Sequence, residues 1–120
     1  MRATSGTQVA VSVSGAKSES WLDANIDNPF MDWVEDSKPF GAAACKAYAK
    51  AVKALDAADS PERTEAALRG FVADLNAVQK KYGLIDTMNR EHAAEVFTDL
   101  AARAGVPEDS AEAWFEDRNF

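Results

Sequence analysis

The segment from Pro61 to Tyr82 has the pattern of a long amphipathic helix, and it constrains the fold more than any other part of the sequence. Its apolar residues recur every three or four positions, which places them on one side of a helix. They are Leu68, Phe71, Val72, Leu75, Val78 and Tyr82. Ser60 and Pro61 are typical of a helix start, and Gly83 is typical of a left-handed C-terminal cap followed by the apolar Leu84 of a Schellman ending. A helix with one apolar side must pack against other elements.

Three further segments have the helical pattern needed to pack against it. The alanine-rich segment 40–58 repeats Ala44, Tyr48, Ala51, Val52 and Leu55 at helical intervals. The segment 87–104 is expected to bury Ala93, Val96, Phe97, Leu100 and Ala101 and to end at Gly105 in the same fashion as the preceding helix. The segment 108–118 carries the adjacent pair Trp114 and Phe115, which can cover the end of a small bundle.

Shorter helices are predicted upstream of residue 40. Ser18 or Ser20 can cap a short helix that ends by Asn28, and Asn28–Pro29 can open a second one. Lys38–Pro39 is expected to close that second helix, because the residue before proline is disfavoured in helical geometry. Residues 1–18 are expected to form an irregular or disordered arm. We therefore predict an all-α fold, a compact bundle of four to six helices, with residues 19–120 as a single domain.

The charge of the chain excludes one class of function. Twenty acidic and 13 basic residues give a formal net charge of −7, whereas nucleic-acid binding needs a concentrated basic surface. No apolar stretch is long enough to span a bilayer or to act as a signal peptide, and the single cysteine cannot form an intramolecular disulfide. A cytoplasmic location without membrane association is the expectation.

The residue types that carry catalysis are scarce. His92 is the only histidine and Cys45 the only cysteine, and neither stands in a motif for a zinc site or an activated nucleophile. We expect a buried, inert thiol at Cys45 and an ordinary surface or boundary position for His92. An enzyme that uses His92 with nearby Glu91 and Glu95 is the least favoured of the functional hypotheses. No catalytic residue, metal site or cofactor is predicted.

The charges are segregated along the chain. Residues 1–37 hold 6 acids and 2 bases, and residues 84–120 hold 9 acids and 3 bases. Between them, residues 38–58 hold 4 lysines and 1 acid. Lys46, Lys50 and Lys53 are spaced to share one side of a helix, which is either a solvated face or a docking surface for an acidic segment.

Acidic and aromatic residues are mixed in the stretch that precedes this lysine-rich helix. This mixture is typical of a protein interface, because an aromatic ring can anchor in a pocket while carboxylates meet basic groups around it. The candidate partner-binding residues are Trp21, Asp23, Asp27, Asp32, Trp33, Glu35 and Asp36. Tryptophans on short amphipathic helices also fill cores, so both interpretations stay open.

The run from Phe71 to Glu91, FVADLNAVQKKYGLIDTMNRE, combines leucine-asparagine, a helix ending in tyrosine, an isoleucine-acid-threonine turn and an arginine-glutamate pair. It resembles small helical bacterial immunity proteins of polymorphic or contact-dependent toxin systems, over about Phe71 to Gly105. The resemblance implies stoichiometric binding to a toxin domain, often a cationic nuclease. From the residues alone, the same run can simply fix the corner between two helices, with Asp86 or Thr87 as the cap.

Together these patterns favour a non-enzymatic protein-binding module, of the immunity type, that neutralises a cognate toxin domain; a cationic toxin domain is the expected partner. The alternative is a structural or scaffold domain that forms homo-oligomers by docking its lysine-rich helix on the acidic region of a second copy.

Overall fold

The computed structural model describes residues 27–120. A 3-10 helix, η1 (Met31–Glu35), precedes four α-helices: α2 (Lys38–Ala57), α3 (Pro61–Tyr82), α4 (Thr87–Arg103) and α5 (Glu108–Phe115). This part of the chain contains no strand, so the predicted all-α class is confirmed. The predicted arm over residues 1–18, and the helix predicted from Ser18 or Ser20, lie outside the described residues.

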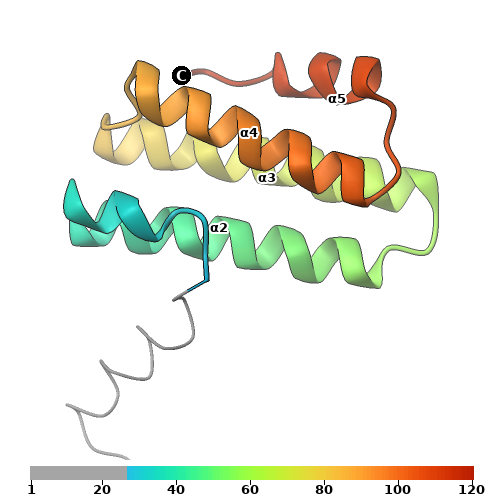
Figure 1. Ribbon diagram of the computed structural model, residues 1–120, viewed down its shortest axis with the longest axis horizontal. Coiled ribbons are helices and arrows are strands. Elements are labelled where there is room, and N and C mark those ends of the chain that lie inside the picture. The colour runs from blue at the N-terminus through green and yellow to red at the C-terminus, as the bar shows by residue number, and fades with distance from the viewer. Residues whose placement is uncertain (1–26) are drawn as a thin grey trace, which may run out of the picture.

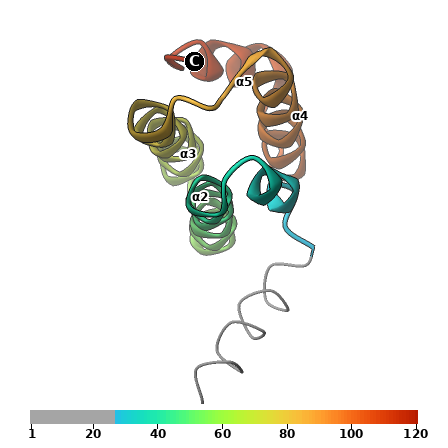
Figure 2. The ribbon, with the colours of Figure 1, turned by 90° about the vertical axis from the view of Figure 1, so that its left-hand side faces the viewer.

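The helices surround one core. In Figure 1, α2, α3 and α4 run alongside one another, and α5 lies across the top. Viewed end-on in Figure 2, the elements follow one another around the core in the order α2, α3, α5, α4 and η1. The short element η1 therefore lies between α2 and α4, and α5 covers the side where α3 and α4 meet.

The long helix α3 has the bounds that its sequence predicts. The Ser60 hydroxyl accepts a hydrogen bond from the Arg63 amide at 3.2 Å and caps the first turn. At the other end Gly83 adopts a φ of 66°, and its amide donates to the Gln79 carbonyl at 2.8 Å. Lys80 and Lys81 lie in the last turn, where cations complement the helix dipole.

The predicted Schellman ending at Leu84 is wrong. The bond from Gly83 to Gln79 is the single one of the simpler αL ending, and Leu84 is 38% exposed. The next residue, Ile85, is buried instead, and its amide donates to the Gln79 side chain at 2.9 Å. The chain turns so that Ile85, rather than Leu84, reaches the core.

Helix α4 ends as predicted. The Val106 amide donates to the Ala101 carbonyl at 2.9 Å and the Gly105 amide to Ala102 at 3.0 Å, which is the bond pair of a Schellman motif. Asp86 is the cap at the other end and accepts from the Asn89 amide at 2.8 Å. All five residues predicted to be buried on this helix are buried, namely Ala93, Val96, Phe97, Leu100 and Ala101.

The region around Asn28 to Phe40 differs from the prediction. The Asn28 side chain folds back and accepts from the Phe30 amide at 3.0 Å, so helical geometry begins only at Met31, and as a 3-10 turn. Lys38–Pro39 does not close a helix but opens α2, with Ser37 as its cap. Proline is tolerated there because first-turn amides need no intrahelical partner.

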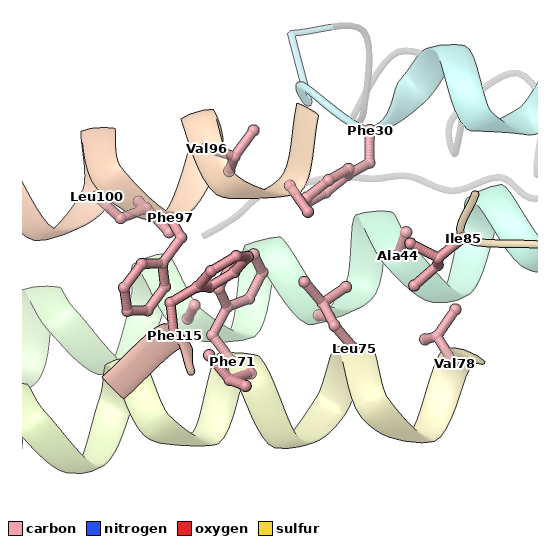
Figure 3. Packing of buried hydrophobic residues seen from close by; sticks show 14 of the residues in the cluster. Phe30, Ala44, Phe71, Leu75, Val78, Ile85, Val96, Phe97, Leu100 and Phe115 are labelled. Carbon is pink, nitrogen blue, oxygen red and sulfur yellow. The ribbon is translucent and has the colours of Figure 1, made fainter. Parts of the chain in front are cut away.

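The core is built around aromatic rings. Phe30 is fully buried, and its ring centroid lies within 6.2 Å of the rings of Trp33, Tyr48, Phe71 and His92, from η1, α2, α3 and α4 respectively. Figure 3 shows Phe71 and Leu75 from α3 pointing toward the same interior as Phe97 and Leu100 from α4. The Phe115 ring from α5 packs on Phe97 at 5.1 Å.

Candidate interaction surface

Trp33 belongs to the core. It is 2% exposed, and its ring stacks on Phe40 with a centroid separation of 5.0 Å and an interplanar angle of 7°. The indole of Trp33 therefore cannot act as an exposed anchor for a partner in this structure, and for this residue the core interpretation holds. Trp21 and Asp23, two other candidates, lie outside the described residues.

The four remaining candidates are exposed carboxylates. They are Asp27, Asp32, Glu35 and Asp36. The last three lie on or directly after η1, which packs with its buried Trp33 inward and thereby turns its acidic side chains toward solvent.

The acidic side of η1 continues onto α4, although the two are far apart in sequence. The Asn89 side chain donates to the Asp36 carboxylate at 3.3 Å, and the Trp33 indole donates to His92 at 3.1 Å. Glu95 follows His92 by three residues on α4, so it lies on the same side of that helix, and it is exposed. We call Asp32, Glu35, Asp36 and Glu95 the acidic face.

The acidic face has unpaired charge and an apolar neighbour. None of its four carboxylates forms an ion pair with another residue of the segment 27–120. Met88 precedes His92 by four residues on the same side of α4 and is 78% exposed. An exposed apolar side chain beside unpaired carboxylates is a composition suited to protein binding.

The basic residues lie elsewhere on the molecule. Lys46, Lys50 and Lys53 are all exposed on α2, as their spacing predicts. Lys50 is directed toward α3, where its ammonium group lies 3.3 Å from the Asp74 carboxylate. These three lysines, which we call the lysine face, lie on the helix that borders α3, whereas the acidic face includes a residue of α4.

Cys45 is buried, and His92 is half-buried. Cys45 is 1% exposed, and burial raises the pKa of its thiol, which opposes formation of a reactive thiolate. The Nδ1 atom of His92 accepts the Trp33 indole hydrogen. No group of three His, Cys, Asp or Glu side chains suited to a metal ion occurs within residues 27–120. Both side chains therefore contribute to packing.

Sequence reasoning did not find the contact between η1 and α4. It is formed by residues 59 positions apart in the case of Trp33 and His92, and by residues 53 positions apart in the case of Asp36 and Asn89. Neither pair stands in a local pattern, so no sequence signal was available. Met88 was missed as well, because its exposure depends on how α4 is rotated in the bundle.

No family model, no curated protein and no solved structure matches the chain. Within the described segment, no helix is both long enough and apolar enough to cross a membrane.

Proposed function

We propose that this protein is a non-enzymatic binding module of the immunity type, which neutralises a cognate toxin domain through the acidic face. The proposal rests on one observation. The exposed carboxylates of η1 and Glu95 of α4 lie on one side of the molecule, beside the exposed Met88. The likeness of the segment from Phe71 to Gly105 to immunity proteins supports the same class of function.

The chemistry of the acidic face specifies the kind of partner. Unpaired carboxylates at the surface steer a cationic protein toward them and accelerate association at low ionic strength. Met88 has a flexible thioether side chain that adapts to an apolar pocket. The expected partner surface therefore has lysine or arginine side chains around a small apolar depression.

The site on the toxin follows from the same reasoning. Nuclease domains bind anionic phosphates and are cationic at that site. An acidic protein face can occupy such a surface by imitating the phosphate charge. Neutralisation then results from occlusion of the active site, with one immunity protein for each toxin domain.

The direct experiment is co-expression and pull-down with the toxin domain encoded by the adjacent gene. We expect a one-to-one complex and protection of the host cell. A triple reversal in the acidic face, Asp32→Lys, Glu35→Lys and Asp36→Lys, is expected to weaken binding between about 3-fold and about 150-fold, since exposed ion pairs contribute roughly 0.2 to 1 kcal/mol each.

A matched control separates the acidic face from net charge. Asp56→Lys, Glu62→Lys and Asp109→Lys change the charge by the same amount at three other exposed positions. These changes are expected to leave binding nearly unaltered. Equal weakening by both sets, or no complex with the neighbouring gene product, contradicts the proposal.

The second candidate is self-association, which the separation of the lysine face from the acidic face favours. The lysine face of one copy is complementary to the acidic face of another, and such a head-to-tail contact is sensitive to salt. Light scattering at low ionic strength is expected to show oligomers that dissociate in about 0.5 M salt. A monomer at all ionic strengths excludes this candidate.

A further inference from the structure

The single histidine of the chain accepts a hydrogen bond from a buried tryptophan. The Trp33 Nε1–H group points to the Nδ1 atom of His92 at 3.1 Å. Trp33 is 2% exposed, so no other acceptor, water included, readily replaces this one. The ring of Phe30 lies against both, with centroids 4.6 Å from Trp33 and 5.5 Å from His92.

This bond requires a neutral imidazole. Its Nδ1 lone pair accepts the indole hydrogen, while Nε2 carries the ring's own hydrogen. In the imidazolium ion both nitrogens carry hydrogen and neither can accept. Rotation of the ring cannot restore the bond, so protonation leaves the indole donor without its partner.

The surroundings of His92 favour a move of the protonated ring toward solvent. The side chain is half-buried, and the acidic groups of the neighbouring elements are exposed. On η1 and just after it these are Asp32, Glu35 and Asp36, and on α4 they are Glu91 and Glu95. The charged or titratable groups on the facing part of α2 are Lys38, Cys45 and Tyr48, and the Tyr48 hydroxyl accepts from Arg103 of α4 at 3.2 Å.

Little else ties η1 to α4 by side-chain hydrogen bonds. Within the described residues, the other such contact is the exposed one from Asn89 to Asp36, at 3.3 Å. The hydrogen bond from Trp33 to His92 is the more buried of the two, and it is the one that an imidazole proton can break.

We propose that protonation of His92 is an acid-sensitive switch: it breaks the hydrogen bond to Trp33 and loosens η1, and with it Asp32, Glu35 and Asp36 of the acidic face, from α4. The loosening is a property of this chain alone. Its consequence, weaker partner binding at acidic pH, rests on the function proposed above.

The switch is tested by NMR on the intact chain at about pH 8 and about pH 5, the range in which histidine side chains gain a proton. The Trp33 indole resonance is assigned by its loss in Trp33→Phe. We expect its protection factor against hydrogen exchange, and those of the η1 amides, to fall between about 2-fold and about 10-fold on acidification, the range set by one net hydrogen bond.

Two variants isolate His92 from the carboxylates that also titrate. His92→Asn offers an amide oxygen at the position of Nδ1 that accepts at every pH, so its Trp33 indole is expected to stay equally protected at both. His92→Phe has no acceptor and is expected to show the low protection at both pH values. The proposal fails if the Trp33 indole does not respond while the His92 ring gains a proton, or if His92→Asn responds as wild type does.

A binding measurement distinguishes failure of the His92 switch from failure of the proposed function. If the toxin-domain complex forms, its affinity is expected to fall on acidification for wild type and to fall less for His92→Asn. If no complex forms at any pH, the proposed function fails, while the NMR result still decides whether the switch exists.

Discussion

The two ends of the bundle are packed on different principles. At the end that holds η1, the interior is aromatic, with Trp33 stacked on Phe40 and Phe40 in edge contact with Tyr82 at 6.0 Å. At the end where α2 connects to α3, the helices meet through small side chains, and an open groove of about 370 Å³ lies between them. Its lining includes Ala51, Ala54, Ala57, Ala58, Ala66, Ala67 and Gly70.

The two ends are therefore expected to differ in how well they tolerate substitutions that change side-chain volume. At the aromatic end, side chains of fixed shape fill the interior, so lost or added volume is costly. At the alanine-rich end, solvent already borders the helix contact, and added atoms find room. The proposed switch at His92 belongs to the first kind of packing, in which a small chemical change affects several elements at once.

The largest effect is expected for Phe30→Ala, which removes the ring that contacts η1, α2, α3 and α4. Truncation of a buried phenylalanine costs roughly 3 to 5 kcal/mol, from lost transfer free energy and the cavity left behind. Chemical denaturation of the variant measures this loss. Met88→Ala serves as the control and is expected to change stability by less than about 0.5 kcal/mol, since Met88 is exposed. A loss below about 1 kcal/mol for Phe30→Ala contradicts this central role.

The next-largest change in stability is expected from alanine substitutions at two glycines, one at each end of the bundle. A Cβ at Gly41 would lie 2.4 Å from the Val34 amide nitrogen, so Gly41→Ala forces η1 and α2 apart and costs about 1 to 3 kcal/mol. A Cβ at Gly70 meets nothing within 4 Å, and Gly70→Ala is expected to stabilise helix α3 by roughly 0.5 to 1 kcal/mol. Thermal unfolding of both variants measures the contrast. Stability changes of the same sign in the two variants would contradict the proposed difference in packing between the two ends of the bundle.

A smaller effect, equal at the two ends, is expected from the helix caps. Ser37 caps α2 at the aromatic end and Ser60 caps α3 at the alanine-rich end. Either serine-to-alanine change is expected to cost about 1 kcal/mol, because a cap satisfies a local amide whatever packs nearby. Urea denaturation of Ser37→Ala and Ser60→Ala tests this. A loss several times larger for Ser37 would mean that capping there is coupled to the aromatic packing.

The smallest effect concerns Cys45, whose pKa is raised above its ordinary value of 9.0 by burial at the aromatic end. Its stabilising contribution is complete well below pH 9.0 and decreases as the pH rises toward and past that value, because the unfolded thiol then ionises while the folded one keeps its proton. The free energy of unfolding of wild type relative to Cys45→Ala is therefore expected to decrease between about pH 8 and about pH 10. The decrease is less than about 1.4 kcal/mol per pH unit, the limit for a single titrating group. An advantage that is constant or grows contradicts the assigned burial of the thiol.

The all-α class and most helix bounds follow from local sequence signals, as at Ser60, Gly83 and Gly105. Caps and left-handed glycines act through hydrogen bonds between residues a few positions apart, so a single sequence contains the whole signal. The same local logic was wrong at Lys38–Pro39, because a proline is compatible both with the end of one helix and with the first turn of the next.

Which residues come into contact depends on how the helices pack together. Helix packing buries Trp33, places Ile85 rather than Leu84 in the core and leaves Met88 exposed. It also brings the acidic residues of η1 to the same side as Glu95 of α4. These outcomes depend on contacts between residues up to 59 positions apart, such as Trp33 and His92. Such contacts arise from the joint packing of several helices, and the helical periodicity of one segment does not specify which other segment its apolar side will cover.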